Sequence, residues 1–153
     1  NRCRRQRQMC IRDSNKPLPI YGKGKNSREW IYVKDHCEAL IKVYQKGKIG
    51  EFYNIGSNKN LNNLEVCRKL MTVSKQIIRI GKKVKIAFVK DRPGHDVRYA
   101  IDASKIEREL GWTPIESFES GIRKTVEWYL SNNPWWQRVL DGSYTLERLG
   151  VGK

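Results

Sequence analysis

Several features are missing from this sequence of 153 residues, and each absence excludes a class of protein. No apolar run approaches the roughly 20 residues that a membrane-spanning helix needs, and no signal-peptide pattern is present. The four cysteines form no Cys-x-x-Cys pair, and neither of the two histidines stands at metal-ligand spacing from them. We therefore expect no membrane partner, no metal site and a reduced, cytoplasmic chain.

Acidic residues are also scarce, because 16 Asp and Glu face 31 Lys and Arg, for a net charge of +15. Such an excess of positive charge is typical of proteins that bind nucleic acid. Residues 1–14 alone hold five arginines and one aspartate, and the remaining positive charge is mostly scattered lysine without an interleaved aromatic stripe. We expect no nucleic-acid partner, and a basic nucleic-acid-binding module remains the alternative from another class. The length fits one folded domain.

The most informative stretch is Phe88–Asp102, in which strand-like residues break at Pro93–Gly94 and resume at Tyr99–Ile101. The break carries Arg92, His95 and Arg98. Arginine pairs phosphate oxygens two at a time, so this composition suits an anionic ligand, above all a diphosphate. The alternative is a solvated loop in which the two arginines pair with the neighbouring aspartates.

The same stretch resembles the C-terminal substrate-binding region of dTDP-glucose 4,6-dehydratases, which are extended short-chain dehydrogenase/reductase enzymes that act on nucleotide sugars. The resemblance covers nearly everything from Asn15 to the end of the chain. It continues through Pro17–Gly22, Arg28–His36, Tyr53–Gly56, Glu109–Trp112 and Glu147–Gly150.

This resemblance implies a small C-terminal α/β substrate-binding domain over residues 15–153, with the Rossmann half missing. We expect residues 1–14 to be a non-native or disordered arm. Relatives usually have aspartate where this chain has Glu29, and we expect the longer side chain to shift Arg28 slightly. The substrate-binding residues that the resemblance implies are Pro19, Ile20, Tyr21, Arg28, Asn63, Arg92, His95 and Tyr99.

The resemblance further implies that the missing N-terminal half binds NAD and carries the chemistry. No GxxGxxG loop is present, and the two Tyr-x-x-x-Lys spacings, Tyr21–Lys25 and Tyr44–Lys48, fall across a glycine turn and a helix end. We therefore expect no catalytic residue here and an inactive fragment of a dTDP-glucose dehydratase, whose full-length form is a homodimer. A fragment of another nucleotide-sugar epimerase or decarboxylase is the alternative, and the choice between deoxythymidine and uridine stays open.

Local patterns predict the elements. We expect extended segments at 17–21, 28–33, 51–55, 84–89 and 99–101. Asp35 should cap a helix, with Glu38 closing the capping box, a buried stripe of Cys37, Leu40, Ile41 and Tyr44, and a stop at Gly47. Further helices should begin at Asn62 or Asn63, at Asp102 or Ser104 (ending at Gly111), at Ser117 and at Asn133.

Overall fold

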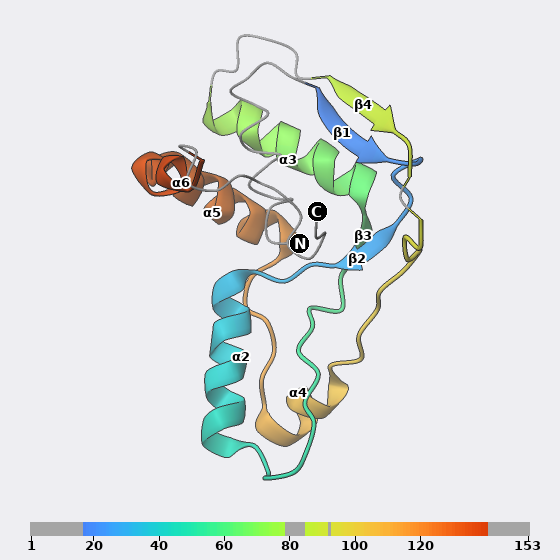
Figure 1. The fold of residues 1–153 in the computed structure, drawn as a ribbon. Coiled ribbons are helices and arrows are strands. Elements are labelled where there is room, and N and C mark those ends of the chain that lie inside the picture. The colour runs from blue at the N-terminus through green and yellow to red at the C-terminus, as the bar shows by residue number, and fades with distance from the viewer. Residues whose placement is uncertain (1–16, 79–84, 92, 141–153) are drawn as a thin grey trace, which may run out of the picture.

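The structure is a computed structural model that describes residues 17–78, 85–91 and 93–140 (Figure 1). The predicted arm at 1–14 and Arg92 lie outside the described residues. The described chain combines helices with short strands, which confirms the predicted α/β class. The described elements are β1 (Leu18–Tyr21), β2 (Ser27–Glu29), α2 (Val33–Lys46), β3 (Asn60–Asn62), α3 (Asn63–Ile77), β4 (Ile86–Val89), α4 (Ser104–Leu110), α5 (Phe118–Ser131) and α6 (Asn133–Leu140).

Two short two-stranded sheets organise the upper part of Figure 1. β1 runs parallel to β4, with Leu18 opposite Ile86, and β2 runs antiparallel to β3. Leu18 and Ile20 are buried while Pro19 and Tyr21 are half-buried, which is the alternation expected of a strand with one face on a core. The extended segment predicted at 17–21 and the strand predicted at 84–89 are therefore confirmed, the latter in shortened form.

Helices α3 and α5 pack against each other beside these sheets. The start of α3 follows the sequence prediction, because the Asn62 side chain accepts a hydrogen bond from the Glu65 amide and the Glu65 carboxylate accepts one from the Asn62 amide. This reciprocal capping box satisfies two backbone donors that a helix start otherwise leaves open. Ser117 caps α5 in the simpler way, by accepting from the Ser120 amide.

The lower part of Figure 1 contains α2, α4 and the extended segment 51–57 that runs between them. Its core is a cluster of buried residues from α2 and from the chain around α4, against which Tyr53 and Ile55 pack. Gly111 ends α4 in the left-handed conformation at φ 60°, as predicted for the helix stop. The buried cluster is Ala39, Ala103, Ile106, Leu110 and Trp112.

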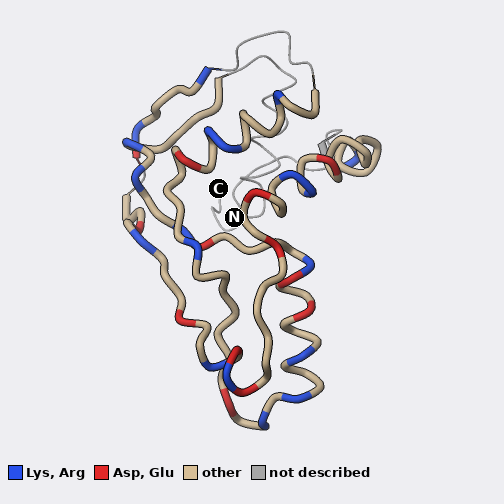
Figure 2. The backbone as a smooth tube through the Cα atoms, turned by 180° about the vertical axis from the view of Figure 1, so that it is seen from behind, with Lys and Arg blue, Asp and Glu red and all other residues tan. Residues whose placement is uncertain are grey.

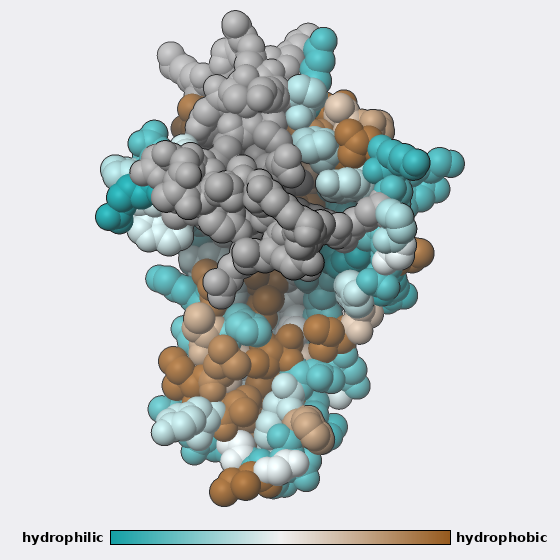
Figure 3. Space-filling model, viewed as in Figure 1, coloured by the Kyte–Doolittle hydropathy of each residue, from teal (hydrophilic) through white to brown (hydrophobic). Residues whose placement is uncertain are grey.

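The face that α2 buries is not the predicted one. Ala39 is fully buried, whereas Cys37, Leu40 and Ile41 are exposed and Tyr44 is 92% exposed. Positions two apart on a helix differ by about 200°, so Cys37 and Ile41 lie opposite Ala39. The predicted buried stripe was therefore wrong, and it forms an apolar surface that Figure 3 shows over α2.

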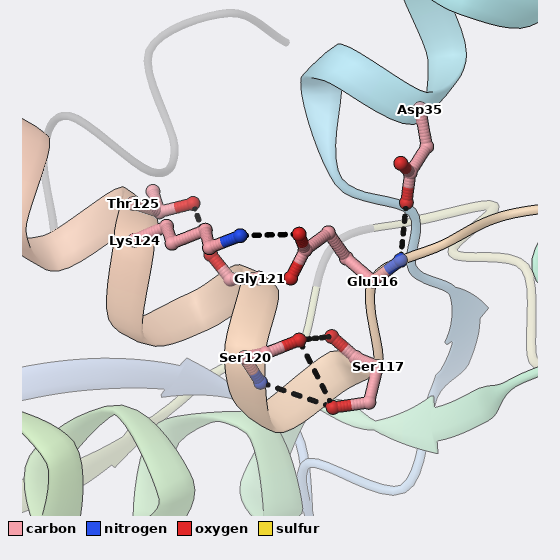
Figure 4. A network of polar contacts seen from close by, with 7 residues as sticks. All are labelled: Asp35, Glu116, Ser117, Ser120, Gly121, Lys124 and Thr125. Atoms are coloured by element: carbon pink, nitrogen blue, oxygen red, sulfur yellow. Dashed lines mark hydrogen bonds and ion pairs between the residues drawn. The ribbon is translucent and has the colours of Figure 1, made fainter.

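The predicted cap of α2 was also wrong. The helix begins at Val33 with Tyr32 in the N-cap position and no side-chain cap. Asp35 is only 3% exposed, and its Oδ2 accepts a hydrogen bond from the backbone amide of Glu116 at 3.0 Å (Figure 4). The Asp35 carboxylate thus joins α2 to the segment that leads into α5, far away in the sequence.

Two predicted strands are absent from the described residues. Segments 51–55 and 99–101 have strand-type composition, yet neither pairs in a ladder, and Arg98 makes only an isolated bridge with Ser27. A strand exists through hydrogen bonds to a neighbour, and composition alone supplies none. β2 is likewise shorter than predicted, because the chain leaves the ladder after Glu29 and enters α2 at Val33. In the described ranges, no helix has the length and apolar character for a membrane crossing.

The Asp35–Glu116 hydrogen bond generates a stability prediction. We expect Asp35→Ala to lower the free energy of unfolding by about 1–3 kcal/mol, because it leaves a buried amide without its charged acceptor. Glu38→Ala, on the exposed side of the same helix, is the matched control and should change stability by less than about 0.5 kcal/mol. Urea denaturation measures both, and equal losses would show that the Asp35 contact contributes nothing specific.

Candidate functional site

The turn after β1 brings the chain against the stretch Phe88–Asp102, which is called the motif from here on. Gly22 and Gly24 both have positive φ, at 55° and 69°. A Cβ on Gly22 would lie 2.7 Å from Asp91 Oδ2, and one on Gly24 would lie 2.8 Å from Ile20 Cγ2. These positions therefore need glycine both for conformation and for space. The turn places β1, β2 and the motif within contact of one another.

Arg28 projects from β2 onto the motif. Its Nη1 donates to the Ser27 carbonyl at 2.6 Å, and its Nη2 donates to the Asp96 carbonyl at 2.9 Å. The guanidinium carbon lies 4.5 Å from the centroid of the Tyr99 ring, in cation–π geometry. Within the described residues the other N–H donors of Arg28 have no acceptor, so this planar fork is oriented and can still bind an anion.

Asn26 links the start of α3 to the Asp96 carbonyl, which Arg28 also binds. Its side chain is buried, and Nδ2 donates to the Asp96 carbonyl at 3.0 Å. The Asn26 carbonyl accepts from the amide of Asn63, the first residue of α3, at 3.1 Å. Since Asn62 is the cap, a capping role does not account for Asn63. Asn26 and Arg28 therefore share the Asp96 carbonyl, and Asn26 connects the helix start to it.

His95 packs inward from the motif with its side chain only 2% exposed. Nδ1 lies 2.6 Å from Asp91 Oδ1, and the ring meets Tyr21 edge-on at 6.4 Å. A carboxylate only accepts, so Nδ1 carries the hydrogen, and Nε2 accepts when the ring is neutral and donates when it is protonated. Buried Nε2 has no hydrogen-bond partner among the described residues. It is thus a buried polar atom whose hydrogen-bonding capacity is unused.

The structure gathers five of the eight predicted substrate-binding residues around this motif. Tyr21, at the end of β1, is half-buried, and Tyr99 is about half exposed beneath Arg28. Pro19 and Ile20 lie further back in β1, where the Ile20 side chain is buried in the core. Arg92 lies outside the described residues. Tyr21 contacts His95, Arg28 contacts Tyr99, and Asn63 is linked to the motif through Asn26.

The acidic residues of the motif make their own contacts. Asp91 contacts His95, and Asp96 accepts from the Tyr99 hydroxyl. The Ser104 amide donates to Asp102 at 2.9 Å and holds the pKa of that carboxyl below its usual range. In the described part of the chain, no ion pair joins Arg98 to these carboxylates. Arg98 therefore does not form the aspartate pairs of the solvated-loop alternative, while Arg92, the other arginine of that alternative, lies outside the described residues.

Two features of this region were not predicted from the sequence. Asn26 was missed, since a single asparagine beside a glycine turn carries no distinctive pattern. A mostly apolar cavity of about 360 Å³ opens between α3 and α5, lined among others by Val66, Ile122 and Val126. None of the predicted site residues lines this cavity. No group of three metal-ligating side chains was found in the parts of the chain that the structure describes.

The chain matches a known protein family. Residues 6–125 match the GDP-mannose 4,6 dehydratase family, and the match begins within the predicted arm. The chain belongs to this family. It is 52% identical over 144 residues to a dTDP-glucose 4,6-dehydratase of Neisseria meningitidis serogroup B, covering 90% of this chain and 41% of the relative.

Solved structures agree. A dTDP-glucose 4,6-dehydratase from Streptomyces venezuelae, crystallised with NAD and TYD bound, matches with a TM-score of 0.76 and 39% identity, over 85% of this chain and 39% of that one. A UDP-glucose 4-epimerase from Thermotoga maritima, with UDP-glucose, matches with a TM-score of 0.70 and 25% identity, over 79% and 37%. The chain spans about 40% of the length of the dehydratases that it matches.

The described residues do not form a dinucleotide site. Such a site needs a strand, a glycine-rich loop and a helix in succession, so that backbone amides meet the pyrophosphate. Among the described elements β1 is followed by a glycine turn, but that turn leads into β2 and not into a helix. The sequence contains no GxxGxxG loop elsewhere.

The close contacts at the glycine turn can be tested. We expect Gly24→Ala to destabilise the chain by about 1–3 kcal/mol more than Gly94→Ala, because its methyl group would overlap Ile20. Gly94 also has a positive φ, 64°, but a Cβ there would meet nothing within 4 Å, so it isolates the conformational cost. Thermal and urea unfolding measure the difference, and equal losses would contradict the tight packing at Gly24.

Proposed function

We propose that this chain supplies the nucleotide and diphosphate contacts of an NAD-dependent dTDP-glucose 4,6-dehydratase, a lyase that converts dTDP-glucose to dTDP-4-keto-6-deoxyglucose. The observation that carries the proposal is that Arg28 binds the Asp96 carbonyl of the motif that also holds His95, and that Asn26 links the start of α3 at Asn63 to the same carbonyl. The 52% identity to the Neisseria meningitidis enzyme supports this activity among those of the family.

Arg28 is the principal diphosphate ligand in this proposal. Its guanidinium is already fixed by two backbone carbonyls and the Tyr99 ring, so little freedom is lost when the fork pairs with phosphate oxygens. Arg92 is proposed as a second arginine, and Nε2 of His95 as a further hydrogen-bonding group. Pro19, Ile20 and Tyr21 are proposed beside the nucleotide, Ile20 through its backbone. Binding of these parts positions the sugar for reaction.

The chemistry itself is assigned elsewhere. Since the described residues form no dinucleotide site and the sequence has no GxxGxxG loop, we assign NAD binding and the chemistry to the part of the relatives that this chain does not span. That chemistry is oxidation at C4, loss of water across C5–C6 and return of the hydride. The exposed apolar face of α2, with Phe52 86% exposed on the unpaired segment beside it, supports a covering polypeptide there. We also propose a cytoplasmic location and a homodimeric full-length enzyme.

Other functions have less support. The epimerase alternative corresponds to relatives at 25% identity, about half the identity to the dehydratases. A nucleic-acid-binding module would need its positive charge gathered on one face. Figure 2 instead shows acidic residues interspersed with lysine and arginine along the described helices. Lys124 and Lys105, for example, pair with Glu116 and Glu51. We propose neither a nucleic-acid nor a membrane partner.

The role of Arg28 gives a binding prediction. Arg28→Lys should weaken binding of dTDP about tenfold or more, because lysine lacks the planar fork and the stacking on Tyr99. Arg108→Lys, at an exposed position of α4, is the matched control and should leave the affinity unchanged. Calorimetric or NMR titration of the chain with dTDP measures both. Equal affinities of the wild type and Arg28→Lys would remove Arg28 from the diphosphate site.

The assignment of the catalytic steps to another part of the enzyme gives a second prediction. Purified chain incubated with dTDP-glucose and NAD should form no 4-keto-6-deoxy sugar, because it has no dinucleotide site of its own. The full-length Neisseria meningitidis relative serves as the positive control under the same conditions. Keto-sugar formation above the blank by this chain alone would contradict the assignment of the chemistry to another part of the enzyme.

A further inference from the structure

The Glu29 carboxylate binds two segments that are distant in the sequence. Oε1 accepts a hydrogen bond from the Asn58 amide at 2.8 Å, and Oε2 accepts one from the Ile101 amide at 2.9 Å. Asn58 precedes β3, while Ile101 lies near the end of the motif. Both oxygens are therefore used by backbone donors, one on each side of β2, in charge-assisted hydrogen bonds.

Gly56 fits this carboxylate closely. A Cβ on Gly56 would lie 2.3 Å from Glu29 Oε1, well inside van der Waals contact, and Gly56 itself is buried. Its φ lies outside the range that favours glycine, so the backbone conformation does not demand glycine there. The space occupied by the Glu29 carboxylate is what excludes a side chain at position 56.

The Ile101 contact completes a double attachment of the motif to β2. At one end, the Ser27 amide donates to the Val97 carbonyl at 2.8 Å, and the Tyr99 amide donates to the Ser27 carbonyl at 3.1 Å. At the other end, Glu29 holds Ile101. The Tyr99 amide belongs to the first attachment, its hydroxyl donates to Asp96, and its ring lies beneath the Arg28 guanidinium. Loss of the Glu29 end would release the chain directly after Tyr99 and so remove one of the restraints on the direction of that ring.

We propose that Glu29 is a positioning residue of the diphosphate site, which fixes the Tyr99 ring beneath Arg28 and thereby sets the direction of the guanidinium. The ligand part of this inference rests on the proposed function. The structural part does not, because the Arg28–Tyr99 contact exists without ligand. Glutamine at position 29 has one acceptor oxygen and one amide donor group, so it accepts from only one of the two backbone amides.

The structural part is tested by NMR on the unliganded chain. In Glu29→Gln we expect the amide of Asn58 or Ile101 to exchange with solvent about tenfold faster, as a lost charge-assisted hydrogen bond implies. The Arg28 side-chain resonances should lose the ring-current shift caused by Tyr99. Glu38→Gln, an exposed glutamate on α2, is the control and should change neither. Unchanged exchange and unchanged Arg28 resonances in Glu29→Gln would overturn the proposal.

A second variant guards against misfolding of the first. Gly56→Ala keeps the carboxylate but displaces Oε1, so it should reproduce the loss of the Arg28 ring-current shift. An unchanged shift in this variant would likewise overturn the proposal.

The ligand part is tested with dTDP and thymidine as probes. Glu29→Gln should weaken dTDP binding about tenfold and leave thymidine binding unchanged, because only the diphosphate contacts Arg28. Equal weakening of both probes would overturn a positioning role in favour of general destabilisation. A wild-type chain that does not bind dTDP would count against the proposed function, while the ring-current measurement would still decide the role of Glu29.

Discussion

The attachment of the motif to β2 is the interaction on which the candidate site depends. The Asp96 carbonyl accepts from Asn26 and Arg28, while Glu29 holds the far end through Ile101. Each of these hydrogen bonds joins one side chain to one backbone group, so the attachment does not rely on pairs of matched side chains. The three residues of β2 and the preceding Asn26 thereby tie the Arg28 guanidinium, the Tyr99 ring and the start of α3 to the motif.

The lower part of the molecule follows a different constraint. Ala39 and Ile106 bury a small core between α2 and α4, while the opposite face of α2 and one side of the segment 51–57 remain exposed. An amphipathic helix with both a buried and an exposed apolar face is incomplete as a surface element. The burial of apolar surface that packs α3 against α5 is thus incomplete in this part, which is suited to a covering polypeptide. The relatives are more than twice as long as this chain, in line with that inference.

Local signals predicted well wherever a short-range hydrogen bond or a backbone conformation decided the outcome. The Asn62–Glu65 capping box, the Ser117 cap and the Gly111 stop each involve residues a few positions apart. Predictions failed where a distant segment competed. Asp35 has the spacing of a cap, but the amide of Glu116 recruits its carboxylate. The stripe of Leu40, Ile41 and Tyr44 has helical spacing, but α4 packs on the other face.

The sequence by itself determined the α/β class, the helix boundaries set by caps and glycines, and the motif with its arginines and histidine. Those features depend on residues that are neighbours along the chain. Only the tertiary structure decided that Arg28 lies on Tyr99, that Asn26 joins α3 to the motif, and that Glu29 spans Asn58 and Ile101. Each of these contacts joins segments at least 29 positions apart or fixes a ring direction. No local pattern encodes such contacts, because packing of the whole chain selects among many alternatives of similar energy.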